Sequence, residues 1–194
     1  MEVTAPPLRH LALIPVAVAI NLALSALVDP TGLPLFLDTA GTVLAAALAG
    51  PLIGVTTGIV TSVTNSLRNP TYLPFVLVQV MVALYAWMAA RLALFRRPAT
   101  TVPAGLALGI RAAAVSTPIS YAVFGCATSG GVTLLTLLGR RLGLSDLGAC
   151  AFGSFLSDFG DKAATFALVA GVLHALPRRT AARFPLALRA AGRA

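Results

Sequence analysis

Long stretches without charge are the feature that most constrains the fold of this chain. Leu11–Val28 contains 18 uncharged residues, and Thr39–Leu67 contains 29. A transmembrane helix needs about 20 mostly apolar residues to cross about 30 Å of hydrocarbon, so stretches of this length predict membrane-embedded helices. The composition agrees, because 58% of the residues are hydrophobic and 10% are charged, whereas roughly 25% are charged in soluble domains. We therefore predict an integral membrane protein.

Prolines, glycines and arginine pairs divide these stretches into segments. They predict an all-α membrane protein, a six-transmembrane-helix bundle that forms a single integral-membrane domain over residues 1–194. The expected helices cover approximately residues 11–28, 37–49, 52–67, 72–94, 103–126 and 152–176. The second and third are short, so they must tilt or be sheltered by their neighbours. The glycine-rich connection 128–148 is expected to lie partly on the membrane surface.

The distribution of positive charge predicts the orientation of the bundle. Cytoplasmic N and C termini place nine arginines inside (Arg9, Arg91, Arg96, Arg97, Arg178, Arg179, Arg183, Arg189 and Arg193) and three outside (Arg68, Arg140 and Arg141). This asymmetry follows the positive-inside rule. The same orientation leaves only Glu2 inside and sends all five aspartates to the outer half: Asp29, Asp38, Asp146, Asp158 and Asp161. We expect an outward-facing polar chamber.

The sequence Ser157-Asp158-Phe159-Gly160-Asp161-Lys162 places three charges inside the last predicted helix. Asp158, Asp161, Lys162 and Thr165 share one helix face at i, i+3, i+4 and i+7. If the helix starts near Phe152, they lie roughly 9 to 20 Å deep. Two interpretations stay open: a ligand-binding face with ionic anchors, or a self-neutralising Asp158–Lys162 pair that fixes helix packing. Arg111 either reaches these aspartates or extends to the cytoplasmic interface, and we favour a structural role for it.

A second polar group surrounds the predicted loop between the third and fourth helices: Asn65, Arg68, Asn69, Tyr72 and Gln79. Its amides, planar cation and ring suit a heteroaromatic or carboxylated small molecule. The alternative is that Asn69 caps a turn and that Tyr72 belongs to the interfacial aromatic belt. Tyr121 and Asp38 are further candidates of the same kind.

Several classes of function find no support in the sequence. Asp158 and Asp161 lie on one helix, whereas an intramembrane aspartyl protease needs opposed carboxylates from two helices. No phosphate-binding loop and no metal-ligand spacing occurs, so we predict that the protein is not an enzyme and binds no metal. The pI of 11.1 reflects arginines that face cytoplasm and anionic lipid, so no nucleic-acid partner is expected. For Cys126 and Cys150, we expect small buried thiols rather than the alternative, a disulfide.

Two segments together resemble a known family. The run Leu33-Pro34-Leu35-Phe36-Leu37-Asp38-Thr39-Ala40-Gly41-Thr42, followed by Gly50-Pro51, is similar to the substrate-specific S components of energy-coupling factor (ECF) vitamin transporters. The segment Ser157–Lys162, with the closing Pro177-Arg178-Arg179, resembles the last helix of the same group. The resemblance covers about Leu11 to Phe184.

The resemblance implies a multi-pass protein of the bacterial cytoplasmic (inner) membrane that captures a vitamin or related micronutrient from outside. Its partners would be the ECF transmembrane scaffold subunit and two ATPase subunits, which hydrolyse the ATP, so the chain itself needs no cofactor. Family members use an Ala-x-x-x-Ala pattern for scaffold docking, which falls on Ala19 and Ala23. The family's pocket maps onto seven residues: Asp38, Asn69, Tyr72, Gln79, Tyr121, Asp158 and Lys162.

Two other functions stay open. The bundle could be a membrane sensor module for a small ligand, or a stand-alone secondary transporter, although no inverted repeat is detectable in the sequence. No substrate-diagnostic motif identifies the vitamin.

Overall fold

The computed structural model describes residues 8–128 and 130–192, and within them the chain is all helical, without strands. Glu2 and Arg193, which enter the charge comparison, lie outside the described residues. The helices are α1 (Leu8–Leu11), α2 (Leu13–Val28), η1 (Asp29–Thr31), α3 (Ala40–Ala49), α4 (Pro51–Ser66), η2 (Pro70–Phe75), α5 (Val76–Arg91), α6 (Pro98–Phe124), α7 (Gly130–Arg141), α8 (Asp146–Ala175), α9 (Arg178–Ala181) and α10 (Pro185–Ala190). The predicted all-α fold is confirmed.

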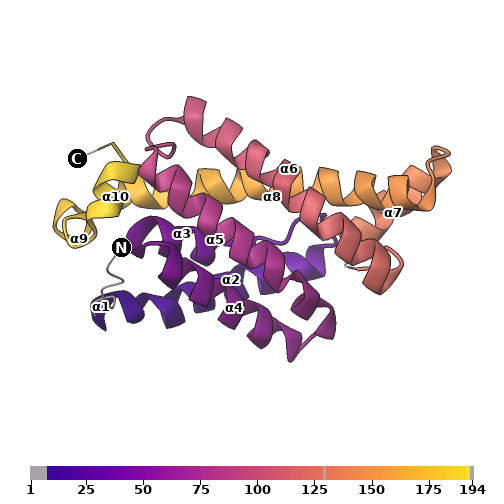
Figure 1. The fold of residues 1–194 in the computed structure, drawn as a ribbon, viewed down its shortest axis with the longest axis horizontal. Helices are drawn as coiled ribbons and strands as arrows, with labels where there is room; N and C mark the ends of the chain where they lie inside the picture. The colour runs from indigo at the N-terminus through magenta and orange to yellow at the C-terminus, as the bar shows by residue number, and fades with distance from the viewer. Residues whose placement is uncertain (1–7, 129, 193–194) are drawn as a thin grey trace.

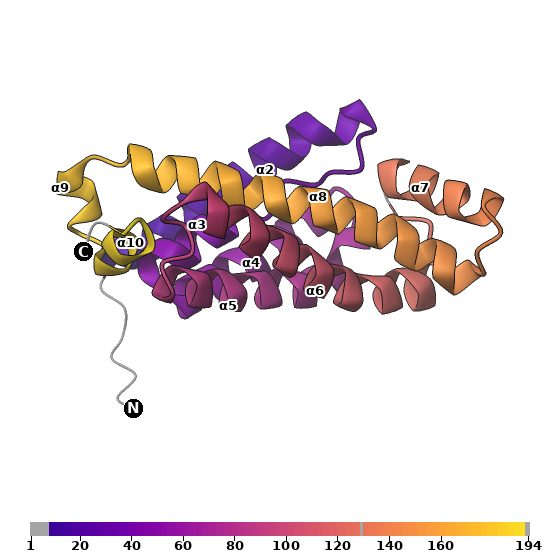
Figure 2. The same ribbon diagram turned by 90° about the horizontal axis from the view of Figure 1, so that it is seen from above.

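The long helices run side by side along the length of the molecule (Figures 1 and 2). The two chain ends lie with α9 and α10 at one end, and α7 lies at the opposite end (Figure 1). The end that carries α7 also holds the last turn of α6 and the first turn of α8. We call the end that carries α7 the loop-rich end and the end that carries α9 and α10 the terminal end.

Three helical segments are long and apolar enough to cross a membrane: Leu13–Thr31, Pro70–Arg91 and Pro98–Phe124. Their outer faces carry large apolar side chains such as Val16, Leu77 and Ile110, each more than half exposed. A lipid environment would cover such faces. The structure is thus compatible with the predicted membrane protein.

The short helix α3 lies in the middle of the fold and packs against α2, α4, α5 and α8. Eight of its ten residues are buried, and half of these eight are alanines. Small side chains permit this close packing, because a Cβ atom placed on Gly54 of α4 would collide with Ala46. The expected sheltering of a helix too short to span comfortably is therefore observed for α3.

Several predicted helix boundaries were wrong. Helix α6 starts at Pro98 rather than at Pro103, so Pro103 and Pro118 both lie inside it. Pro98 suits the first helical position, since its fixed φ is already helical and its missing N–H would lack a partner there. Helix α3 starts at residue 40 rather than 37, because residues 32–39 form an extended loop.

The last long helix also begins earlier than predicted, at Asp146 instead of near residue 152. The Ser145 side chain accepts a hydrogen bond from the Gly148 N–H at 3.2 Å, and such caps stabilise helix starts. Over 30 residues, α8 is about 45 Å long. Its charged residues, 12 to 16 positions from the start, therefore lie about 18 to 24 Å along the helix, farther from its start than predicted.

The predicted surface connection 128–148 contains the helix α7. Its buried Val132 and Thr136 face α8, while Leu134, Leu137 and Leu138 are exposed. Arg140 at its end forms a salt bridge of 2.9 Å with Asp146. The segment thus has one face on the protein and one apolar face outside.

Cys126 and Cys150 form a disulfide, which corrects the prediction of two buried thiols. Gly125 adopts a left-handed conformation after α6 and turns the chain toward α8, so that the two Cα atoms lie 5.4 Å apart. Such bonds persist in oxidising compartments. The bond joins the end of α6 to the start of α8 at the loop-rich end.

Removing this disulfide is expected to lower the free energy of unfolding by about 3.5 kcal/mol, the chain-entropy value for a loop of this size. The measurement is SDS unfolding of the purified protein with and without reductant. As the control, the Cys126→Ala/Cys150→Ala variant should not respond to reductant. Equal stability of the reduced and oxidised wild-type protein would contradict this expectation.

Candidate functional site

A cavity of about 320 Å³ opens at the loop-rich end of the bundle. Its walls come from η1, the loop before α3, η2 and the helices α4, α5, α6, α7 and α8. The lining residues are Asp29, Phe36, Asp38, Thr39, Ser62, Asn69, Thr71, Tyr72, Phe75, Val78, Gln79, Ser116, Ser120, Thr128, Val132, Ser154, Ser157, Asp158 and Lys162. Most of these residues carry a hydroxyl, amide or carboxylate group.

Six of the seven candidate binding residues lie on the cavity wall, namely Asp38, Asn69, Tyr72, Gln79, Asp158 and Lys162. Tyr121 does not, since its side chain is 46% exposed on the outside of α6. Ser116 and Ser120 of α6 face the cavity four residues apart, and the next residue points about 100° away. The structure therefore does not bring Tyr121 to the cavity with the other six residues, and the neighbouring Ser120 lines the wall instead.

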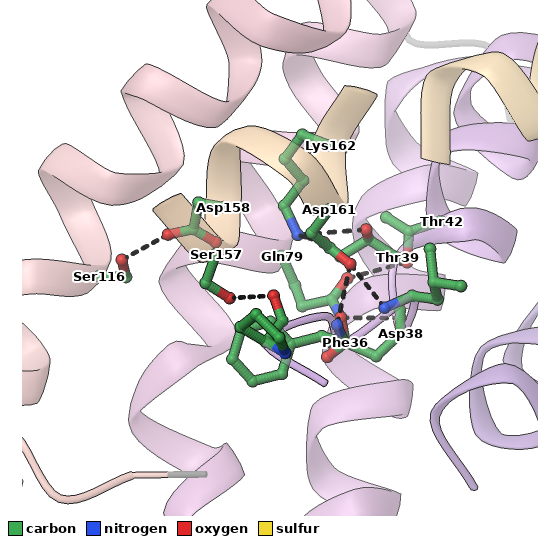
Figure 3. A network of polar contacts seen from close by, with 12 residues as sticks. Phe36, Asp38, Thr39, Thr42, Gln79, Ser116, Ser157, Asp158, Asp161 and Lys162 are labelled. Carbon is green, nitrogen blue, oxygen red and sulfur yellow. Dashed lines mark hydrogen bonds and ion pairs between the residues drawn. The ribbon is translucent and has the colours of Figure 1, made fainter. Parts of the chain in front are cut away.

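Asp161 of α8 binds the loop before α3 through hydrogen bonds (Figure 3). Its Oδ1 accepts hydrogen bonds from the backbone N–H groups of Phe36 at 2.9 Å and Leu37 at 2.7 Å. A third hydrogen bond joins the two segments, because Ser157 Oγ donates to the Pro34 carbonyl oxygen at 2.8 Å. Asp161 is completely buried. This carboxylate therefore acts as the anchor of an irregular segment that lies far from α8 in sequence.

Lys162 pairs with Asp161 rather than with Asp158, so the Asp158–Lys162 pair, one of the two interpretations left open, is not formed. Lys162 Nζ lies 2.5 Å from Asp161 Oδ2 and 3.4 Å from Thr39 Oγ1. Both charged side chains are almost fully buried. The Asp158 carboxylate turns toward α6 instead, where a hydroxyl group is available (Figure 3).

Asp158 has one bonded oxygen and one open oxygen. Ser116 Oγ donates a hydrogen bond of 2.7 Å to Asp158 Oδ2, whereas Oδ1 has no hydrogen-bond partner within residues 8–128 and 130–192. The residue is 5% exposed and borders the cavity. A buried carboxylate with a free acceptor is suited to hold a donor on a ligand.

A network of uncharged polar groups supports the opposite wall. Asn21 Nδ2 donates to Thr42 Oγ1 and Thr61 Oγ1, both at 2.9 Å. Thr42 Oγ1 in turn donates to Gln79 Oε1 at 2.9 Å, and Gln79 Nε2 donates to the Asp38 carbonyl oxygen at 3.1 Å. The network joins α2, α3, α4 and α5, and it fixes Gln79 and Asp38 at the cavity.

Sequence reasoning missed Asn21, Thr42 and Thr61 in this role. The available signal was Asn21 itself, an amide in the middle of the uncharged stretch Leu11–Val28. Buried amides in membrane helices usually bond across to other helices.

The rim of the cavity contains the polar group around η2. Tyr72 Oη donates to Asp29 Oδ1 at 3.3 Å. Asn69 Oδ1 accepts from the Thr71 N–H at 3.1 Å, so the turn-capping role predicted as an alternative for Asn69 is confirmed. Arg68 is exposed, and Asn65 is buried with its Nδ2 unpartnered.

Arg111 lies apart from the site. Its guanidinium donates to the Ala107 carbonyl oxygen at 2.8 Å and lies 5.2 Å from the centre of the Tyr85 ring. No ion pair joins it to Asp158 or Asp161 in the structure. The structural role favoured for this residue agrees with these contacts.

Two glycines bring α6 close to the charged face of α8. A Cβ atom on Gly109 would collide with the backbone of Asp158 and Phe159, and one on Gly105 with that of Lys162 and Ala163. The spacing of small residues four apart therefore serves close helix packing here. This packing brings Ser116, two turns beyond Gly109, within reach of Asp158.

Within the described part of the chain, no group of three or more His, Cys, Asp or Glu residues could hold a metal ion. The cavity instead offers hydrogen-bonding groups, the buried carboxylate of Asp158, the half-buried carboxylate of Asp38 and the rings of Phe36, Tyr72 and Phe75. Such groups can bind and orient a small polar molecule. No protein-family model, curated protein or solved structure matches this chain.

Proposed function

We propose that this protein is the substrate-binding (S) component of an ECF-type importer, which captures a vitamin or related micronutrient from outside the cell. The observation that carries the proposal is the polar cavity inside a helical bundle whose outer faces are apolar. Its volume of about 320 Å³ lies at the small end of the usual range of ligand sites, about 300 to 1,000 Å³. A ligand of one or two rings fits such a space.

The proposal includes six membrane-spanning helices with both termini in the cytoplasm. Helices α9 and α10 lie at one end of the bundle (Figure 1). Helix α10 packs against α5, which ends at Arg91, and the Arg96 side chain lies against Gly192. These arginines support a cytoplasmic position of this end under the positive-inside rule. The cavity opens toward the other end and would face outside. The disulfide at that end agrees with this orientation, since an oxidising compartment favours it.

In this proposal the chain binds substrate and its partners supply energy. The partners are the transmembrane scaffold subunit and two ATPase subunits, as the family resemblance implies. Ala19 and Ala23 are exposed on α2, and this position supports their proposed role in scaffold docking. Substrate uptake by this chain alone, driven by an ion gradient, would favour a secondary transporter instead. Fusion or copurification with a signalling kinase would favour the sensor module.

The test is thermal stabilisation of the purified protein by a panel of vitamins and their precursors. A ligand at 100 times its Kd should raise the free energy of unfolding by about 2.7 kcal/mol. Asp158→Asn should weaken binding of the stabilising compound by about 10- to 100-fold, the range for losing one hydrogen bond to a charged group. Its folded yield should change less.

The matched control is Asp146→Asn, which removes an exposed carboxylate outside the cavity and should leave the affinity unchanged. If no compound stabilises the protein, the proposed function is wrong. If Asp158→Asn reduces yield and affinity equally, the residue is structural.

A further inference from the structure

The cavity contains more negative than positive groups. Its ionisable lining residues with acidic or basic side chains are Asp29, Asp38, Asp158 and Lys162. The ammonium group of Lys162 is already engaged by Asp161, which lies 2.5 Å away and does not line the cavity. Among the described residues, three carboxyl groups therefore face the space, and the cation on the wall, Lys162, is already paired.

The two deeper carboxyl groups come from different elements and hold open acceptor positions. Asp158 Oδ1 has no hydrogen-bond partner in the described residues, as noted above. Asp38 Oδ2 has only a long hydrogen bond of 3.4 Å from Gln79 Nε2. Burying a carboxylate without a partner costs several kcal/mol, and an opposite charge at short range offsets that cost. A positive group on a ligand would therefore stabilise both carboxylates through their open oxygens.

Aromatic rings complete the wall. Phe36, Tyr72 and Phe75 border the same space as the two acids. Ring faces attract ammonium groups and protonated heterocycles within about 6 Å. They also stack on planar ligands, so one ligand can use the rings and the carboxylates together.

We propose that the cavity selects a small organic cation, with a protonated amine or a quaternary or protonated ring nitrogen beside Asp158 and Asp38. This inference rests on the proposed function and names the chemical class of its substrate. Ligands with a carboxylate or phosphate would add to the negative excess and are disfavoured. This replaces the wider expectation of a heteroaromatic or carboxylated ligand.

The charge preference can be measured without knowing the ligand. Ser120→Cys places a thiol on the cavity wall, and the native cysteines are disulfide-bonded. The probes are two thiosulfonate reagents of similar size, one bearing a trimethylammonium group and one a sulfonate. Their rate ratio, divided by the ratio for a small free thiol, should favour the cationic reagent by about 10-fold or more.

Adding Asp158→Asn to Ser120→Cys should lower that ratio severalfold, whereas adding Asp146→Asn should leave it unchanged. Thr71→Cys at the rim provides a second position should Ser120→Cys fold poorly. A ratio of one, or a preference for the sulfonate, would overturn the proposed charge selectivity.

A matched fragment set then separates this inference from the proposed function. Benzylamine, benzyl alcohol and benzoate share a ring and differ in charge, and benzylamine alone should stabilise the purified protein at millimolar concentration. Stronger stabilisation by the alcohol or by benzoate would overturn the cation inference while leaving a small-molecule binding protein. Stabilisation by none of the fragments, together with none in the vitamin panel, would overturn both.

Discussion

Replacing Asp161 with alanine is expected to lower the free energy of unfolding by about 3 to 5 kcal/mol, the usual cost of removing one partner of a buried ion pair. The substitution leaves the ammonium group of Lys162 without its counter-ion, at 2% exposure. It also leaves the backbone N–H groups of Phe36 and Leu37 without their acceptor. The loop before α3 should detach from α8, and ligand binding should be lost with it.

The measurement is SDS unfolding of the purified variant, with folded yield from size-exclusion chromatography. Adding Lys162→Met removes the unpaired charge and should restore part of the stability, because an unpaired buried ammonium is the most costly consequence. Asp158→Asn serves as the comparison, since that carboxylate has only one hydrogen-bond partner, Ser116. Wild-type stability of Asp161→Ala would refute the role of this residue as the anchor of the loop.

Ala19→Trp or Ala23→Trp is expected to reduce substrate uptake by more than about 10-fold, because a large ring prevents close approach of a partner helix. Both alanines are exposed on the outward face of α2, which borders the bundle on one side (Figure 2). Neither lines the cavity. Ligand affinity of the purified variants should therefore stay within about twofold of wild type, since no binding contact is changed.

Ala114→Trp is the matched control, because Ala114 is also exposed but lies on α6. It should leave uptake near the wild-type level. Uptake is measured with radiolabelled substrate in cells that express the partner subunits. Normal uptake by both α2 variants would refute this docking position, and equal loss in Ala114→Trp would show that any bulky residue on the surface interferes.

The overall class of the fold follows from the sequence because the apolar stretches are long and their interruptions are strong helix breakers. Gly50-Pro51 separates α3 from α4 where predicted. The helix boundaries that were predicted incorrectly depend on tertiary contacts. The second helix was expected to start at residue 37, but the backbone N–H groups of Phe36 and Leu37 bond to Asp161 of α8 and hold this segment as a loop. Helix α7 lies in a glycine-rich segment and packs on α8 through its buried face.

Site residues could be predicted from the sequence where they are charged or polar side chains inside an apolar stretch. Asp158 and Lys162 were conspicuous inside an apolar helix, and helical spacing placed them on one buried face. The spacing could not show which carboxylate pairs with Lys162, because Asp158 and Asp161 both lie within reach in sequence. Ser116 supplies the hydroxyl that binds Asp158, and serine is too common in such helices to signal this. Tyr121 was expected at the cavity but points away from it, because one position along α6 turns the side chain by about 100°. Ser120 lies on the cavity side of the helix instead.

If the protein is the proposed membrane receptor, its small-molecule cavity opens to the outside of the cell. The most direct test of this claim is cysteine labelling of intact cells with a membrane-impermeant maleimide. Asn69→Cys lies exposed at the cavity rim, and Arg97→Cys lies exposed at the opposite end, before α6. We predict that Asn69→Cys is labelled in intact cells and that Arg97→Cys is labelled only after permeabilisation. Labelling of Arg97→Cys in intact cells, with protection of Asn69→Cys until permeabilisation, would contradict the claim.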